Sequence, residues 1–351
     1  MKKGCYLGFA YVPMIMERIP LVPPTIAPVQ AGIFRPLLSV MIPTYNCTQY
    51  LREALVSVLA QDPGADRMQI EVVDDCSTDA DVQAVVQEIG KGRVGYYRQE
   101  RNVGSLRNFE TCLNRSTGKW IHLLHGDDLV KPGFYKEIEN LFTDYPEAGA
   151  AFTGYLHVDE RSEVLYPNDP LSERPCVIAD WLSVIAEGQR VQTPAMVVKR
   201  EVYERLGSFF AFHYGEDWEM WVRIAAHYPV AHSPRHLAKY RVHKKNITSD
   251  YFCSGQNIRD IEKAIEIVRE YLPEDKRAVL NEKAKRHYSR YFARTSDMVY
   301  HSYHHPQQAL AQAKSAFQMD KNPTTLYFVI KMYLKLLIRY RFKDMREPAF
   351  S

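Results

Sequence analysis

The chain contains, at residues 38–46, the stretch LSVMIPTYN, in which a short apolar run leads directly into a polar segment. Residues 70–73 (IEVV) lead in the same way into DDCSTD at 74–79, and residues 120–124 (WIHLL) lead into HGDD at 125–128. Short apolar runs that end at turn-forming residues are typical of buried strands. We therefore expect three strands, each of which ends at a polar segment.

The segments between these runs have the spacing of helices. Apolar residues recur at Leu51, Leu55, Val58 and Leu59. Comparable helical patterns lie near 79–89, 105–115, 133–145 and 217–227, and further strand-like runs lie at 94–97, 148–152 and 237–242. Strands that alternate with helices predict an α/β fold with a doubly wound, mostly parallel sheet.

The two ends of the chain have a different character from the middle. Six of the 20 prolines lie in residues 1–36, which predicts an irregular segment. After about Asp250 the pattern is all helical, through residues 257–271, 275–300, 306–319 and 324–341. We therefore expect a Pro-rich N-terminal extension (1–36), an α/β domain (37–250) and a C-terminal all-helical region (251–351).

Composition and charge narrow the functional classes. The chain has 351 residues, 46% of them hydrophobic and 25% charged, which is ordinary for a folded protein and excludes a disordered or collagen-like chain. The formal net charge is only +3, and the excess of basic side chains lies at the ends: +3 in residues 1–36 and +4 in residues 331–351, against −4 between them. A protein that coats nucleic acid would show a larger basic excess, so we expect no nucleic-acid partner.

The six cysteines are far apart and include no Cys-x-x-Cys pair. This spacing fits neither a zinc site nor a secreted disulfide framework, and it predicts reduced thiols in a cytoplasmic protein. The uncharged run at residues 4–16 is shorter than the roughly 18 to 20 residues of a spanning helix, and no small-residue cleavage site follows it.

The polar segments after the three strands are suited to a nucleotide. In doubly wound sheets, ligands bind beyond the carboxyl ends of the strands. The adjacent pairs Asp74–Asp75 and Asp127–Asp128 would repel each other unless a cation or hydrogen-bond donors lay between them, and carboxylate oxygens suit Mg²⁺ or Mn²⁺. In the alternative interpretation, Asp74, Asp75 and Asp79 only form a turn and cap the next helix.

An ordered set of motifs resembles the family 2 inverting glycosyltransferases of the GT-A fold. The match runs over about residues 37–250. It comprises SVMIPTYN at 39–46, VDDCSTD at 73–79, Asn102-x-Gly104 with Asn108, GDD at 126–128, GEDWE at 215–219 followed by Arg223, and Tyr240-Arg241-Val242-His243-x-x-Asn246.

The resemblance implies roles for individual residues. It implies that Tyr45 and Asp75 hold the nucleotide base, that Asp127 contacts the ribose or diphosphate, and that Asp128 binds a divalent metal, Mn²⁺ or Mg²⁺, whose ligand shell His243 completes. Pro43, Thr44 and Asn108 complete the expected nucleotide-sugar site. Many members have a third acid where this chain has His125-Gly126, which leaves the number of metal ligands and the identity of the metal open.

The same resemblance implies an inverting transfer of a sugar. The donor would be a nucleotide-diphosphate sugar, in particular a UDP-sugar, and the acceptor a hydroxyl of a glycan or a lipid-linked precursor in cell-surface polysaccharide assembly. A hydroxyl is a weak nucleophile, so a carboxylate must take its proton; Asp217 is the expected general base, with Glu216 orienting it or binding acceptor. Taken alone, Asp217 could equally be a surface acid at the start of a helix.

Two other functional classes remain open. A sugar nucleotidyltransferase would normally have a Gly-rich basic loop after the first strand, and residues 43–46 are not such a loop. A non-catalytic scaffold with the same fold could act as a binding module, although the intact acidic residues argue against it. The sequence does not indicate an oligomeric state.

The last predicted helix, at residues 324–341, is amphipathic and basic. One side carries Lys331, Lys335 and Arg339, and the other carries an apolar stripe made of Leu326, Tyr327, Ile330, Tyr333, Leu334, Leu337 and Ile338. Such a helix can lie on an anionic membrane, so peripheral contact with the inner face of the cell membrane is one expectation. In the alternative, the stripe packs on the helical region and the charges are solvated.

Overall fold

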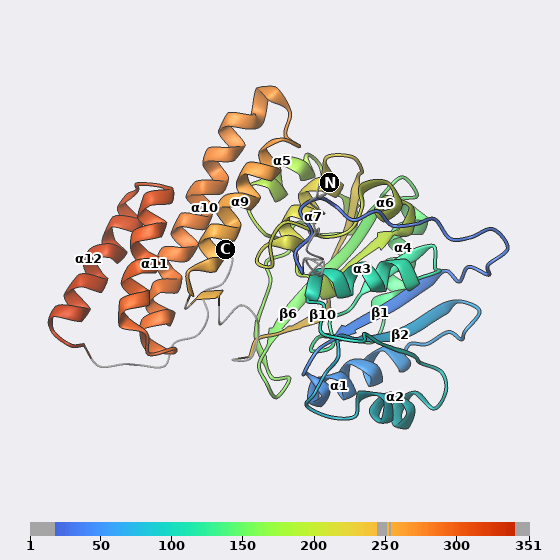
Figure 1. Cartoon of the computed structure of the whole chain (residues 1–351). Coiled ribbons are helices and arrows are strands. Elements are labelled where there is room, and N and C mark those ends of the chain that lie inside the picture. The colour runs from blue at the N-terminus through green and yellow to red at the C-terminus, as the bar shows by residue number, and fades with distance from the viewer. Residues whose placement is uncertain (1–17, 244–250, 253, 341–351) are drawn as a thin grey trace, which may run out of the picture.

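We analysed a computed structural model, which describes residues 18–243, 251–252 and 254–340 (Figure 1). Residues 1–17 of the predicted extension, Asn246 of the last motif, and the basic residues Arg341, Lys343 and Arg346 lie outside the described residues.

The centre of the molecule is a ten-stranded sheet. Eight of its strands follow the order β3-β2-β1-β4-β9-β6-β10-β5, and the other two complete it, because β7 pairs with β6 and β8 pairs with β10. The strands are β1 (Leu38–Thr44), β2 (Met68–Asp74), β3 (Gly95–Arg98), β4 (Trp120–Leu123), β5 (Leu129–Val130), β6 (Ala150–Val158), β7 (Val164–Pro167), β8 (Cys176–Val177), β9 (Met196–Lys199) and β10 (Val230–Arg241).

The expected α/β fold is confirmed, and the sheet is mixed. The pairs β3–β2, β2–β1, β1–β4 and β6–β10 are parallel, as predicted for a doubly wound sheet. β9 lies antiparallel between β4 and β6, and β5, β7 and β8 also pair antiparallel. The apolar pattern of a buried strand does not encode its direction, so the sequence alone did not reveal this second half of the sheet.

In the described residues these strands are accompanied by the helices α1 (Thr48–Leu59), α2 (Val82–Gly90), α3 (Ser105–Arg115), α4 (Phe134–Asp144), α5 (Trp181–Ala186), α6 (Arg200–Leu206) and α7 (Glu216–Ala225), and a short 3₁₀ helix, η1, spans Thr193–Ala195. α3 packs against β1, β2 and β4, and α4 packs against β6 and β10. All seven residues of β1 are buried, which explains why the run that starts the fold is continuously apolar rather than alternating.

Ser39 is a polar residue within the apolar run of β1, and its hydroxyl both donates and accepts a hydrogen bond. The Ser39 Oγ donates to Gln69 Oε1 at 2.6 Å and accepts the backbone N–H of Gly118 at 2.8 Å. A Cβ at Gly118 would lie 2.6 Å from the backbone nitrogen of Ser39, so the turn before β4 can approach β1 only with glycine there. A buried hydroxyl is tolerated in the core because it is hydrogen-bonded.

Residues 18–36 contain no helix or strand, as expected, yet they are packed on the domain. We call them the N-terminal strap. The Ile26 side chain is fully buried, and the Pro24 carbonyl accepts the N–H of Ser208 at 2.8 Å. The strap is the dark blue segment that runs along the domain before β1 in Figure 1.

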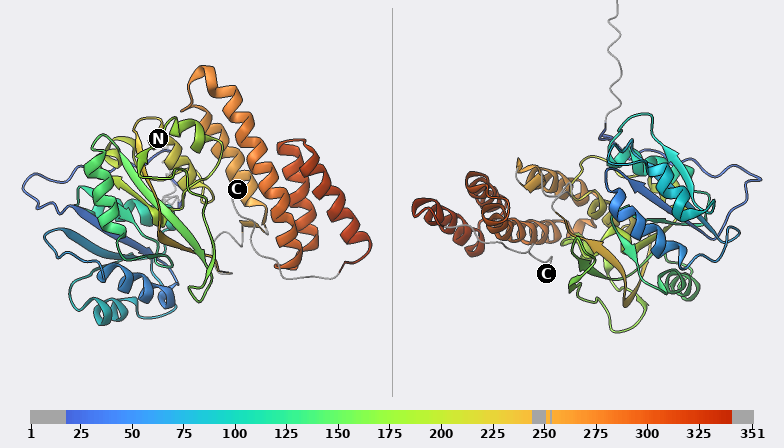
Figure 2. Two further views of the ribbon diagram at one scale, coloured as in Figure 1. Left: turned by 180° about the vertical axis from the view of Figure 1, so that it is seen from behind. Right: turned by 90° about the horizontal axis from the view of Figure 1, so that it is seen from below.

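The C-terminal region consists of α9 (Gln256–Arg269), α10 (Glu274–His301), α11 (Pro306–Met319) and α12 (Pro323–Leu337). α9 packs on α7, α10 packs on α5 and α9, and α11 and α12 continue the stack outward, as both views in Figure 2 show. Within the described parts of the chain, no helix combines the length and the apolar character needed to cross a membrane.

The orientation of α12 differs from both expectations for its charges. Lys331 and Lys335 turn inward and bond to Asp297 of α10 rather than standing in solvent. The apolar stripe does not pack on the helical region either, because its side chains face outward and are between 45% and 80% exposed.

Candidate active site

A cavity of about 1210 Å³ opens at the carboxyl ends of β1, β2 and β4, where the sequence placed the nucleotide. That volume exceeds the roughly 300–1,000 Å³ typical of small-molecule sites. Nine of the ten predicted site residues line it: Pro43, Thr44, Tyr45, Asp75, Asn108, Asp127, Glu216, Asp217 and His243. Asp128 does not line it.

Asp75 is held at one end of the cavity by the loop before α3. Its Oδ1 accepts the N–H of Val103 at 2.7 Å, and its Oδ2 accepts the N–H of Gly104 and the side-chain amide of Asn102, both at 2.9 Å. Desolvation nevertheless raises the pKa of Asp75 above its ordinary value. Tyr45, which also lines the cavity, is 49% exposed.

The other acids of the same motif have structural roles. Asp74 is fully buried, pairs with Arg98 and accepts the hydroxyl of Tyr96 at 2.9 Å. Asp79 accepts both the backbone N–H and the hydroxyl of Thr48 at 2.9 Å and so supports the start of α1. The turn-and-cap interpretation therefore describes Asp74 and Asp79, although the helix that Asp79 supports is α1 and not the following helix.

Asn108 lines the cavity, but its side-chain amide forms hydrogen bonds within the protein. Its Nδ2 donates to the carbonyl of Val73 at 2.9 Å, and its Oδ1 accepts from Gln99 at 3.2 Å. Because Val73 is the penultimate residue of β2, this amide fixes the strand end that carries Asp75.

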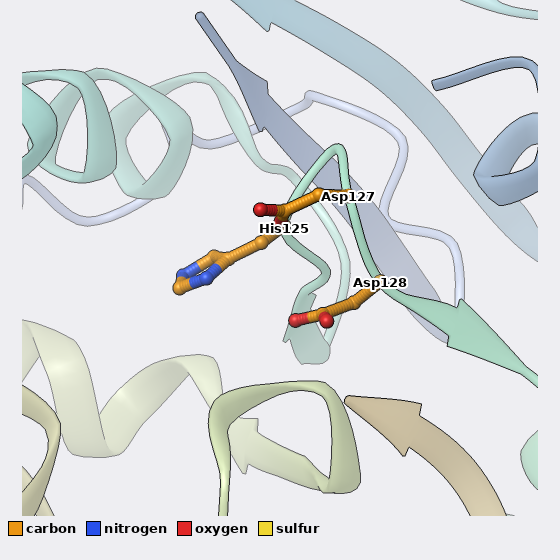
Figure 3. A group of neighbouring side chains, drawn as sticks. All are labelled: His125, Asp127 and Asp128. Atoms are coloured by element: carbon orange, nitrogen blue, oxygen red, sulfur yellow. The ribbon is translucent and has the colours of Figure 1, made fainter. Parts of the chain in front are cut away.

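His125, Asp127 and Asp128 form a group in the loop after β4. One ligand atom from each lies within 4.8 Å of the others, and Figure 3 shows the three side chains extending to the same side of the loop. His243 joins them, because its Nε2 is 3.1 Å from Asp127 Oδ2. Within the described residues, His125 Nε2, Asp128 Oδ2 and His243 Nδ1 are buried polar atoms without a hydrogen-bond partner, which fits a site built to receive a cation.

The pKa values of the two adjacent acids in this group are shifted in opposite directions. Burial opposes ionisation of Asp127, but the hydrogen bond from His243 and the nearby imidazoles hold its pKa below the ordinary value. Desolvation and the charge of Asp127 raise the pKa of Asp128 well above its ordinary value. Asp128 Oδ1 also accepts the N–H of Arg241 at 2.8 Å, so Asp128 ties β10 to this loop.

Asp217 lies across the cavity in the first turn of α7. Its Oδ1 accepts the N–H of Trp218 at 2.8 Å, and its Oδ2 accepts the side-chain amide of Gln189 at 2.5 Å. Desolvation raises the pKa of Asp217 to about 6 despite these bonds. Desolvation and the charge of Asp217 raise the pKa of the neighbouring Glu216 well above its ordinary value. The two acids thus differ in acidity, so one can be ionised while the other holds its proton.

Several lining residues were not predicted from the sequence. Gln189 precedes η1 and belongs to none of the sequence motifs. Other lining residues come from beyond the expected domain boundary at residue 250: Tyr251, Ile261 of α9, and Tyr288 and Tyr291 of α10. Only the packing of α9 and α10 on α5 and α7 brings these residues to the cavity, and no spacing along the chain encodes it.

Comparisons with known proteins agree with this geometry. Residues 39–207 match the family described as Glycosyl transferase family 2. An uncharacterized glycosyltransferase of Haemophilus influenzae is 26% identical over 225 residues, covering 62% of this chain and 68% of that protein. An uncharacterized glycosyltransferase of Rickettsia typhi is 26% identical over 223 residues, covering 62% of this chain and 67% of its own length.

Solved structures share the fold at low identity. Staphylococcus aureus TarS 1–349 in complex with UDP-GlcNAc matches with a TM-score of 0.63 and 16% identity, over 88% of this chain and 95% of that one. The mannosyltransferase PcManGT from Pyrobaculum calidifontis, in complex with GDP-Man and Mn²⁺, matches with a TM-score of 0.53 and 19% identity, over 91% of this chain and 84% of that one. From the family match over residues 39–207, the relatives and the shared fold, we conclude that this chain is a glycosyltransferase with a family 2 domain of GT-A fold.

Proposed function

We propose that the chain transfers a sugar from a UDP-sugar to a hydroxyl acceptor with inversion of the anomeric centre. The observation that carries this proposal is that three acids from different elements line one cavity: Asp75 after β2, Asp127 after β4 and Asp217 on α7. Asp75 accepts the base N–H, and Tyr45 stacks on the base, while Pro43 and Thr44 border the nucleoside. The UDP-GlcNAc bound to TarS supports a uridine donor.

A divalent ion, Mn²⁺ or Mg²⁺, belongs to this proposal. The residues that would hold it are Asp127, Asp128 and His125, with His243 beside them, and their carboxylate and imidazole groups suit Mn²⁺ in particular. When bound, such an ion offsets the negative charge that develops on the leaving diphosphate. The Mn²⁺ in the PcManGT complex supports this assignment.

Asp217 takes the proton of the acceptor hydroxyl as that oxygen attacks the sugar. A base with a pKa of about 6 is largely ionised at neutral pH and still basic enough to accept a proton. Gln189 bonds its Oδ2 and the N–H of Trp218 bonds its Oδ1, so the carboxylate has a fixed direction when the hydroxyl attacks. Glu216 keeps its proton to higher pH than Asp217 does, and it binds a second group of the sugar acceptor.

The test is release of UDP from a panel of UDP-sugars in the presence of Mn²⁺ and a hydroxyl acceptor. Asp217→Asn should lose at least about a hundredfold in kcat and keep its affinity for UDP, because proton removal contributes roughly 10²–10⁴-fold. Gln192→Leu, which changes another lining residue, is the matched control and should retain most of the activity.

Three outcomes would contradict the proposal. If Asp217→Asn turns over as fast as the original chain, Asp217 is not the base. If UDP-sugars bind without any transfer, the chain is a binding module. If the chain makes a nucleotide sugar from a sugar phosphate and a nucleoside triphosphate, it is a nucleotidyltransferase.

We further propose that α12 rests on an anionic membrane, where a lipid-linked acceptor would be found. Its outward face holds Ile330, Leu334 and Leu337, and the exposed Arg339 follows them. Lys331 and Lys335 are bonded to Asp297, but residues 339–351 still carry a formal charge of +2, which complements acidic headgroups. An apolar face bordered by cations is the pattern of helices that lie in a membrane interface.

Vesicle flotation tests this contact. The chain should bind vesicles that contain phosphatidylglycerol more strongly than neutral ones, and the double variant Leu334→Ser and Leu337→Ser should lose that binding. The control is Val56→Ser with Val279→Ser, which also removes two exposed apolar side chains. Equal binding by both variants would refute the contact, and a dimer that only the α12 variant disrupts would show that a second copy covers the face.

A further inference from the structure

The N-terminal strap is docked along the domain at positions that suit its prolines. Because proline has no N–H, the strap bonds through its carbonyls: Pro20 accepts from the N–H of Ala211 at 2.8 Å, and Ala27 accepts from the buried Arg200 guanidinium at 2.8 Å. A Cβ at Gly207 would lie 2.8 Å from both Pro23 Cβ and the Pro24 carbonyl. Gly207 thus gives the strap room to pass, and the strap is a built-in part of the fold.

The described part of the strap begins at Arg18, which lines the cavity together with Ile19. The Arg18 guanidinium donates to Asn102 Oδ1, and the Asn102 amide donates in turn to Asp75. A Cβ at Gly104 would lie 3.1 Å from Arg18 Nε, so the side chain runs close over the loop that holds Asp75. The strap therefore brings a cation to the end of the cavity where the base is proposed to bind.

Arg18 stands out among the charges of the cavity wall. The described lining contains five carboxylates, Asp75, Asp79, Asp127, Glu216 and Asp217, and its arginines are Arg18 and Arg52. Arg52 forms an ion pair with Glu88 at 3.0 Å. Of the arginines and lysines in the described lining, Arg18 is the one that forms no ion pair with a carboxylate, and its donors are available to a ligand in addition to Asn102.

We propose that Arg18 is a nucleotide-binding residue that donates a hydrogen bond to a carbonyl oxygen of the base whose N–H is accepted by Asp75. The proposal rests on the proposed function and extends its site to the N-terminal strap, which precedes the family match at residues 39–207. A uracil presents a carbonyl on each side of its N–H, so a carboxylate facing the N–H also faces the negative ends of those carbonyls. A guanidinium beside the carboxylate removes that repulsion and adds a charge-assisted hydrogen bond.

The experiment measures binding of UDP with Mn²⁺ by calorimetry, and binding of uridine by competition against UDP. Arg18→Ala should weaken both by about tenfold, because a charge-assisted hydrogen bond contributes on this scale. Arg18→Lys should recover part of the loss. The matched control is Arg35→Ala on the same strap, whose guanidinium bonds the carbonyls of Thr117 and Gly118, which are absent from the cavity lining.

Each outcome separates this inference from the proposed function. If the original chain does not bind UDP, the proposed function fails. If it binds UDP and Arg18→Ala binds equally well, the role of Arg18 is overturned while the proposed function stands. A loss for UDP without a loss for uridine would assign Arg18 to the diphosphate and overturn base recognition, and an equal loss in Arg35→Ala would assign the effect to docking of the strap.

Discussion

Asp217 lies in surroundings that weaken its acidity, and the rate of transfer should depend on pH for that reason. Its carboxylate has a pKa of about 6, and only the ionised form can accept a proton. We expect kcat/KM to be level above about pH 7 and to fall tenfold per pH unit well below pH 6. A pH–rate profile with saturating metal checks this, and a rate that is unchanged from pH 8 to pH 4.5 would contradict it.

Gln189 should set the position of that acidic limb. Its amide bonds the ionised form of Asp217, so its removal in Gln189→Leu should raise the pKa of Asp217 and move the limb to higher pH. Gln192→Leu, which alters another residue of the same cavity, should leave the limb in place. A limb that stays in place in Gln189→Leu would mean that Gln189 only supports the local fold.

The same burial implies that ionised Asp217 lowers the free energy of unfolding. A carboxyl whose pKa is higher in the folded state than in the unfolded state, about 6 against 3.8, stabilises least at high pH. Asp217→Asn should therefore raise the free energy of unfolding at pH 8 by at most about 3 kcal/mol, at roughly 1.4 kcal/mol per pKa unit. Urea unfolding at pH 8 and pH 4 tests this: the gain should fall to about 0.5 kcal/mol at pH 4, and a gain of equal size at both would refute the explanation.

Sequence patterns located the acids but did not distinguish their roles. Asp74 and Asp75 are neighbours, yet Asp74 is bonded to Arg98 and Tyr96 while Asp75 lines the cavity. Successive side chains at a strand end point to opposite sides, and the sequence does not indicate which side is the cavity. The roles proposed for individual residues remain predictions.

At the scale of elements, the approach of the turn at Gly118 to β1 is a requirement of the fold. In Gly118→Ala the new Cβ would meet the backbone of Ser39 and Leu38 at 2.6–2.7 Å, and backbone cannot move as a side chain can. We expect a loss of about 3 kcal/mol or more, at the upper end of overpacking costs. Gly95→Ala is the control, because its nearest neighbour is the flexible Glu71 side chain at 3.2 Å. Equal melting temperatures for the two variants would contradict this prediction.

The helix α12 illustrates what amphipathic spacing can and cannot predict. The stripe of apolar residues was recognised correctly, and its outward direction was one of the two expectations, but neither expected that Lys331 and Lys335 turn inward to Asp297 of α10. The partner of a helical face belongs to another element, so periodicity within one helix does not identify it. The strand β9 was not predicted at all, and its antiparallel position between β4 and β6 depends on residues far away in sequence.

At the scale of the whole molecule, the helical region supports the proposed base. The Tyr288 hydroxyl of α10 accepts the backbone N–H of Gln189 at 3.2 Å, and the Tyr288 ring packs edge-on against Trp218, 4.8 Å between centroids. Tyr288→Phe should cost about 1–3 kcal/mol, because it leaves a buried N–H without a partner, and it should lower kcat by displacing Gln189. Tyr327→Phe on the exposed face of α12 is the control. Unchanged kcat and stability in Tyr288→Phe would show that α10 does not support the base.

The wall that α9 and α10 share with the sheet domain has a consequence for protein engineering. A chimera that joined residues 37–250 to the C-terminal helices of a relative would separate Trp218 from Tyr288 and would replace Ile261, which lies 2.6 Å from the place of a Cβ at Gly215. An exchange between relatives that keeps these contacts must therefore transfer α7, α9 and α10 together, so the unit of transplantation is larger than the family domain.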